Sequence, residues 1–140
     1  MADSSAYLKA LTPEARNSLG GAYLQITTFP FRAGRESRLM NRAAAPPDAR
    51  RRPESSPNND LYLLEVGNVF NVSREHFLID YRDGAYVIVD RGSSCGTLVE
   101  GDLVGEKRAG GWRRLENNDV IIVGTSESKF VFKFVIMQNS

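Results

Sequence analysis

The stretch SREHFLIDYRDGAYVIVDRGSSCGT, residues 73–97, carries the strongest local signal of structure in the sequence. Within it, residues 76–82 and 85–90 are rich in β-branched and aromatic side chains, which favour strands. Between them lies Asp83-Gly84, a dipeptide typical of the two-residue turns that join antiparallel strands. The stretch therefore predicts a β-hairpin, followed by a loop that leads to a further strand.

Further short strand-like segments lie on both sides of this hairpin. We expect them at residues 22–28, 29–33, 61–66, 97–99, 102–104, 112–115, 120–124 and 129–136. Pro30 marks a sheet edge or a break between the first two, because proline cannot donate a backbone hydrogen bond. Many short strands at close spacing, with no interior helix pattern, predict an all-β sandwich.

Two segments depart from the strand pattern. Residues 1–21 are expected to form a short helical extension, because Thr12-Pro13-Glu14 places a cap residue, a proline and an acid at a helix start. Residues 38–59 are rich in proline, alanine, serine and charge and hold almost nothing to bury, which predicts a long flexible insertion. The β domain itself is expected at residues 22–137.

Composition narrows the function classes. The length of 140 residues suits one domain. The chain has 18 Lys+Arg and 17 Asp+Glu, so its net charge is close to zero, which argues against binding to nucleic acid or to a membrane through overall charge. The only cysteine, Cys95, excludes an intrachain disulfide and fits a reducing compartment, so a cytoplasmic location is expected. One histidine and one cysteine are too few soft ligands for a structural zinc site. No metal or cofactor is therefore expected.

Three motifs stand at the ends of expected strands. Gly34-Arg35 ends an early strand, Ser73-x-x-His76 precedes the hairpin, and residues 92–97 link the hairpin to the next strand. In a sandwich, such loops cluster at the ends of the sheets and carry function on a rigid frame.

The order of these motifs resembles the forkhead-associated (FHA) domain, a phosphothreonine-peptide-binding module. The family pattern is Gly-Arg, then Ser-x-x-His, then Gly-Ser-x-Asn-Gly-Thr and a Val-Asn-Gly turn, which here reads Val99-Glu100-Gly101. Residues 115–124 are similar to the family's later Leu-x-x-Gly-Asp-x-Ile-x-x-Gly. The resemblance covers residues 22–136 and implies an FHA-type sandwich of two antiparallel sheets. It also implies a non-enzymatic adaptor in Ser/Thr kinase signalling.

The resemblance assigns the phosphate to Arg35 and Ser73, with Arg74 placed to add a second positive charge. A phosphate dianion presents three strong acceptor oxygens, which suit the planar fork of an arginine and the hydroxyl of a serine. The implied partner is a phosphothreonine-containing protein or peptide, either a Ser/Thr kinase or its substrate. Asn71 is the position expected to read the ligand residue three beyond the phosphothreonine.

Other motif residues are given structural roles by the same resemblance. His76 would brace the binding loop through hydrogen bonds, and Gly34 and Gly96 belong to the backbone of the motif. Thr97 would pack and bond within its loop. A catalytic use of His76 is not expected, because Ser73-x-x-His76 lacks the third group that orients the base in a triad.

One departure from the family pattern leaves two functions open. Cys95 stands where the pattern has an asparagine, whose side chain bonds the main chain of the ligand. A thiol is a weak donor and a weak acceptor, so ligand hydrogen bonds would be lost or replaced, in part by Ser94. The chain is then either a phosphothreonine-binding module with altered affinity, or an FHA-fold interaction module that binds its partner independently of phosphate.

Overall fold

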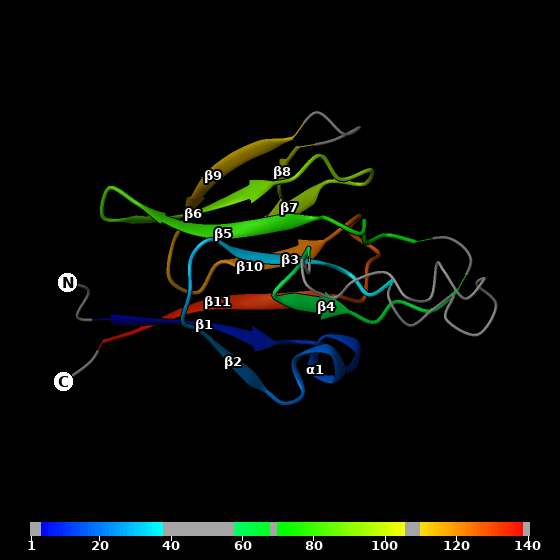
Figure 1. Ribbon diagram of the computed structural model, residues 1–140, viewed down its shortest axis with the longest axis horizontal. Coiled ribbons are helices and arrows are strands. Elements are labelled where there is room, and N and C mark those ends of the chain that lie inside the picture. Colours follow the sequence, from blue (N-terminus) through cyan, green and yellow to red (C-terminus); the bar gives the residue numbers. More distant parts are fainter. Residues whose placement is uncertain (1–3, 38–57, 68–69, 106–109, 139–140) are drawn as a thin grey trace.

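Two β-sheets pack face to face in the computed structural model, which describes residues 4–37, 58–67, 70–105 and 110–138 (Figure 1). Within these residues, one sheet has six strands in the order β2-β1-β11-β10-β7-β8, and the other has five in the order β4-β3-β5-β6-β9. The strands are β1 (Ser4–Ala10), β2 (Tyr23–Ile26), β3 (Phe31–Arg35), β4 (Leu61–Leu63), β5 (Phe77–Arg82), β6 (Ala85–Asp90), β7 (Thr97–Val99), β8 (Asp102–Val104), β9 (Gly111–Leu115), β10 (Val120–Val123) and β11 (Val131–Gln138). The predicted all-β sandwich is confirmed.

The predicted hairpin is formed by β5 and β6. Their register runs from Phe77 opposite Asp90 to Arg82 opposite Ala85, and Asp83 and Gly84 form the turn. Asp83 has φ of 51° and Gly84 has φ of 79°, the pair of positive values that a type I′ turn requires.

The core lies between the two sheets and follows the alternation of the strands. Phe132 and Phe134 of β11 are fully buried, whereas Lys133 between them is only partly covered. Phe77 and Ile79 of β5 are also fully buried and face them from the other sheet. Because successive side chains of a strand point to opposite faces, each strand contributes one face to this core.

One strand pair departs from the antiparallel arrangement. β3 and β4 pair in parallel, with Ala33 opposite Leu61 and Arg35 opposite Leu63, while the other paired strands are antiparallel. Parallel neighbours need a connection of about a dozen residues or more. The long segment between β3 and β4 meets that need.

The sequence predicts a helical extension at residues 1–21. The structure has a helix only in the second half of that range, and residues 4–10 form a β-strand instead. α1 (Pro13–Leu19) begins after Thr12, whose side chain accepts a hydrogen bond from the Ala15 N–H. However, β1 lies between β2 and β11 in the six-stranded sheet, so it is part of the sandwich. Ala6 and Leu8 are buried there, at 2% and 0% exposed. In the described part of the chain, no helix is long and apolar enough to cross a membrane.

The predicted insertion falls mostly outside the described residues, which omit 38–57. Its last residue, Asn59, is described and is only 3% exposed, so it belongs to the folded domain.

The candidate loops lie at one end of the sandwich. β3 ends, β5 begins and the β6–β7 loop turns at that end, whereas the Asp83–Gly84 turn, the start of β1 and the end of β11 lie at the opposite end (Figure 1). The fold therefore brings Arg35, Ser73 and the 92–97 loop to a common edge.

Candidate functional site

Hydrogen bonds centred on Ser73 join the three loops. The Arg35 N–H donates to the Ser73 carbonyl over 2.9 Å, and the His76 N–H donates to the Ala33 carbonyl over 3.0 Å. The Ser94 N–H donates to the Ser73 hydroxyl over 3.0 Å. A hydroxyl that accepts one hydrogen bond still carries its own O–H donor. Ser73 is thus fixed between the other two motifs.

Gly34 allows β3 to approach the Ser73–Arg74 backbone closely. A Cβ atom built on Gly34 would lie 2.0 Å from the Arg74 carbonyl oxygen and 2.8 Å from the Asn59 side-chain nitrogen. No side chain fits at the first distance, so the glycine sets the spacing between Arg35 and the loop that carries Ser73.

Replacing Gly34 with alanine is therefore expected to lower the free energy of unfolding by about 3 kcal/mol, because backbone atoms must move to relieve the clash. Gly21→Ala is the matched control, since its Cβ would meet no atom within 4 Å. Urea denaturation of the two variants measures the difference. Equal stability of the two variants would contradict the proposed close approach.

His76 joins the Ser73 loop to the 92–97 loop from inside the protein. Its side chain is fully buried; Nδ1 accepts from the Ser73 N–H over 2.9 Å, and Nε2 donates to the Gly96 carbonyl over 2.7 Å. This bonding assigns the neutral tautomer with its proton on Nε2. Burial lowers the pKa of His76 below its ordinary value, against the opposing effects of the Gly96 carbonyl and the charges of Asp90 and Glu65. The ring braces the two loops and does not reach the surface.

The lowered pKa of His76 predicts that the fold loses stability in mild acid. Between the folded-state pKa and the ordinary value of 6.5, the unfolded chain binds a proton that the folded chain does not. The free energy of unfolding should therefore fall as pH decreases from about 7.5 to about 5.5. Urea denaturation across this range measures the effect, and NMR of the single histidine ring follows its protonation. A ring that titrates at or above its ordinary pKa would contradict the prediction.

Arg35 is held on one side of the site by the segment before Ser73. Its Nε–H donates to the Val72 carbonyl over 3.0 Å, and its guanidinium carbon lies 4.0 Å from the centroid of the Phe70 ring. Burial, together with the positive charge of Arg74, lowers the pKa of Arg35, while the charge of Glu65 raises it. Arg74 is exposed. Two guanidinium groups thus act on each other at this edge, an arrangement that an anion would stabilise.

The predicted reader position, Asn71, makes contacts within the domain. Its side-chain oxygen accepts from the Thr125 hydroxyl over 2.9 Å, and its amide donates to Glu65 over 3.4 Å. The Glu65 carboxylate also accepts from the Asn71 and Val72 backbone N–H groups, each over 2.9 Å. No local sequence pattern indicates Glu65, because its role depends on the folded path of residues 70–72.

Asp90 organises the 92–97 loop and was not among the predicted residues. It is 3% exposed; one carboxylate oxygen accepts from the Gly92 and Ser93 N–H groups over 2.9 and 2.8 Å. The other oxygen accepts from the Ser93 and Thr97 hydroxyls over 2.6 and 2.9 Å. An aspartate placed shortly before Gly92-Ser93 is typical of an Asx turn, a signal that could have identified it. Thr97 is fully buried and bonds within this loop.

Asn59 and Arg91 hold the loop from the other side, and both were also missed. The Asn59 amide donates to the Arg74 carbonyl over 2.7 Å, and Arg91 donates to the Asn59 side-chain oxygen over 2.6 Å and to the Asn58 carbonyl over 3.1 Å. Arg91 also lies 3.8 Å from the Glu75 carboxylate. Every buried side-chain nitrogen or oxygen in the described residues has a hydrogen-bond partner.

Cys95 lies partly buried in the same loop as Ser94, which is exposed. Its thiol lies 3.9 Å from the Phe70 carbonyl, the long distance of a weak S–H donor. The thiol therefore contacts the segment that supports Arg35.

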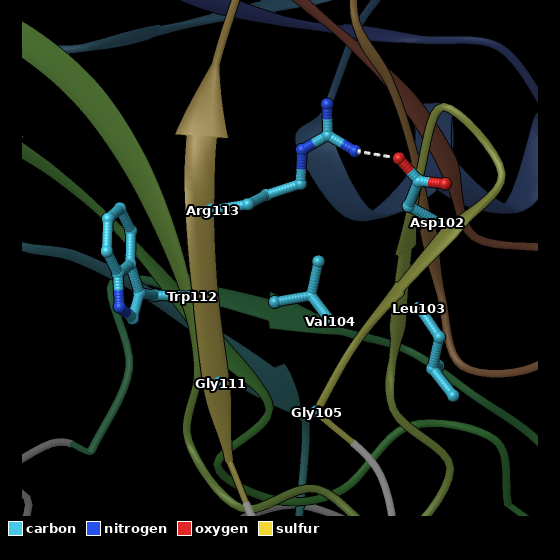
Figure 2. A pocket seen from close by; sticks show the side chains of 7 residues that line it. All are labelled: Asp102, Leu103, Val104, Gly105, Gly111, Trp112 and Arg113. Atoms are coloured by element: carbon cyan, nitrogen blue, oxygen red, sulfur yellow. Dashed lines mark hydrogen bonds and ion pairs between the residues drawn. The ribbon is translucent and has the colours of Figure 1, made fainter.

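A separate groove of about 390 Å³ lies between β8 and β9, and none of the predicted site residues lines it. Figure 2 shows Arg113 reaching from β9 to Asp102 on β8, and these side chains form an ion pair at 2.8 Å. Arg113 also donates to the Val99 carbonyl over 2.9 Å. The ion pair links the edge strands of the two sheets. The side chain of Trp112 lies on the other side of β9 from Arg113 and is 67% exposed (Figure 2).

A family model for the FHA domain matches residues 51–124, just over half of the chain. A comparison with curated protein sequences finds no match.

Solved structures, among them two FHA domains, superpose on nearly the whole chain. The kinase-interacting FHA domain of kinase associated protein phosphatase (KAPP) from Arabidopsis is 20% identical, with a TM-score of 0.64 over 100% of this chain and 99% of that one. The FHA domain of CT664 from Chlamydia trachomatis is 19% identical, with a TM-score of 0.57 over 97% of this chain and 99% of that one. Mycobacterium tuberculosis EmbR, solved in complex with a low affinity phosphopeptide, is 23% identical, with a TM-score of 0.58 over 97% of this chain and 25% of EmbR.

The chain thus spans about a quarter of EmbR and almost the full length of the other two structures. At these identities the likeness shows a shared fold. Together with the match of the family model, it shows that this chain belongs to the FHA-domain family.

Proposed function

We propose that this chain is a phosphothreonine-peptide-binding adaptor in Ser/Thr kinase signalling, with the phosphate held by Arg35 and Ser73. The observation that carries the proposal is the pairing of these residues: the Arg35 N–H donates to the Ser73 carbonyl over 2.9 Å, so the two side chains start from adjoining backbone. Arg74 adds positive charge to the same edge. Donors fixed before binding lose less entropy when a phosphate is bound.

The related structures support this class of ligand. EmbR was solved with a low affinity phosphopeptide, and the KAPP domain is described as kinase-interacting. The expected partner of this chain is accordingly a phosphothreonine-containing kinase or kinase substrate. A cytoplasmic location is part of the same proposal, because a chain with a single cysteine fits a reducing compartment.

The proposed activity is binding without catalysis. The histidine of the site is fully buried, and Ser73 and Gly96 occupy both of its ring nitrogens. It therefore has no nitrogen with which to take a proton from a substrate.

A second candidate, phosphate-independent protein binding, is favoured by Cys95. Its thiol contacts the Phe70 carbonyl and offers a ligand much weaker hydrogen bonding than an amide would. The two candidates are separated by offering the protein a degenerate phosphothreonine peptide library and, in parallel, the unphosphorylated and phosphoserine versions of that library. Selection of phosphothreonine peptides alone supports the adaptor. Equal capture from the phosphorylated and unphosphorylated libraries would favour the second candidate.

A further inference from the structure

We infer that Phe70 is a positioning residue for the phosphate-binding arginine, an inference that rests on the proposed function. The ring of Phe70 lies under the Arg35 guanidinium, with 4.0 Å between the guanidinium carbon and the ring centroid. This distance is well within the range of a cation–π contact. Phe70 precedes Ser73 by three residues, so one short segment carries both the ring and the serine.

A stacked ring orients an arginine without competing for its hydrogen bonds. In such an arrangement the guanidinium N–H groups point outward in the plane of the group and leave its face to the ring. The Nε–H of Arg35 also donates to the Val72 carbonyl over 3.0 Å, which fixes the rotation of the plane about the side chain. The ring and the carbonyl both constrain the direction in which the guanidinium fork points.

The segment that carries Phe70 is itself anchored. The Glu65 carboxylate accepts from the Asn71 and Val72 N–H groups, each over 2.9 Å. The Cys95 thiol lies 3.9 Å from the Phe70 carbonyl. These contacts hold the backbone from the Phe70 carbonyl to Val72, directly after the residue that carries the ring, so Phe70 offers Arg35 a positioned surface.

The consequence for binding is preorganisation. A free arginine side chain samples many rotamers, and ordering it on binding costs free energy. Removing the ring leaves that cost to the phosphopeptide, so Phe70→Leu should weaken binding about two- to twelvefold. Phe70→Tyr keeps the ring and should bind like the wild type. Phe29→Leu, the same change at the opposite end of the sandwich, should leave the affinity unchanged.

Two measurements separate this role from a structural one and from direct contact with the peptide. The first is the NMR order parameter of the Arg35 Nε–H group without ligand, which should be high in the wild type and Phe70→Tyr and lower in Phe70→Leu. The second is the affinity of a phosphothreonine peptide selected from the library, compared for Phe70→Leu alone and in an Arg35→Lys background. Lysine keeps a cation–π attraction to the ring but has no planar face to stack, so the Phe70→Leu effect should be clearly smaller in that background.

The outcomes are distinct. An ordered Arg35 in folded Phe70→Leu, or an affinity loss of equal size in the Arg35→Lys background, would overturn the inference. A wild-type protein that selects no phosphopeptide would instead defeat the proposed function, and the role of Phe70 in phosphate binding would fall with it. In that case the order parameters would still show whether Phe70 orders Arg35.

Discussion

Replacing Asp90 with alanine is expected to lower the free energy of unfolding by at least about 3 kcal/mol. The buried carboxylate accepts four hydrogen bonds, from the Gly92 and Ser93 N–H groups and from the Ser93 and Thr97 hydroxyls. Without it, these donors lie in a water-poor loop with no acceptor, and each such donor costs about 1–3 kcal/mol. Asp90→Asn keeps one side-chain oxygen and should lose less stability than alanine.

Asp102→Ala is the matched control for this variant. The Asp102 side chain is 77% exposed and pairs with Arg113, so its loss should cost no more than about 1 kcal/mol. Urea denaturation of the three variants gives the comparison. A loss below about 1 kcal/mol for Asp90→Ala would show that the carboxylate does not organise the loop as its four bonds indicate.

The second large effect is expected on binding. Arg35→Ala should weaken phosphothreonine-peptide binding by about 100-fold or more, because charge-assisted hydrogen bonds to phosphate are the strongest that the site offers. Arg35→Lys keeps the charge but loses the planar fork, so it should fall between alanine and the wild type. Isothermal titration calorimetry with a peptide selected from the phosphothreonine library measures these differences.

Arg82→Ala is the control, because Arg82 lies beside the Asp83–Gly84 turn at the opposite end of the sandwich (Figure 1). Its affinity should match that of the wild type. The Arg35 N–H is a backbone group, so the alanine variant keeps its bond to the Ser73 carbonyl and is expected to fold. Unchanged affinity in folded Arg35→Ala would rule out a phosphate site built on this arginine.

The parts of the fold that were predictable are those that depend on local pattern. The β5–β6 hairpin needed only two alternating segments and Asp83-Gly84 between them. β1 was missed because its buried residues include the small Ala6, and because a clear helix start at Thr12 follows it. The parallel pairing of β3 with β4 has no local sign, since it depends on the path of the long segment between them.

The residues of the candidate site also differ in whether the sequence alone could identify them. Arg35, Ser73 and His76 could be selected from motifs whose order resembled a known family. Asn59 and Glu65 could not, because each acts through backbone groups that only the folded chain brings near: the Arg74 carbonyl, and the N–H groups of residues 71 and 72. A sequence motif therefore indicates candidate ligand-binding side chains more readily than it indicates the side chains that hold the loops.

The most direct test of phosphate recognition at this edge is a ¹⁵N NMR titration with a phosphothreonine peptide and its unphosphorylated counterpart. The site predicts that the phosphopeptide alone shifts the backbone signals of Ser73, Arg74 and Ser94 and the Nε–H signal of Arg35. Equal shifts with both peptides, or shifts confined to the groove between β8 and β9, would contradict it.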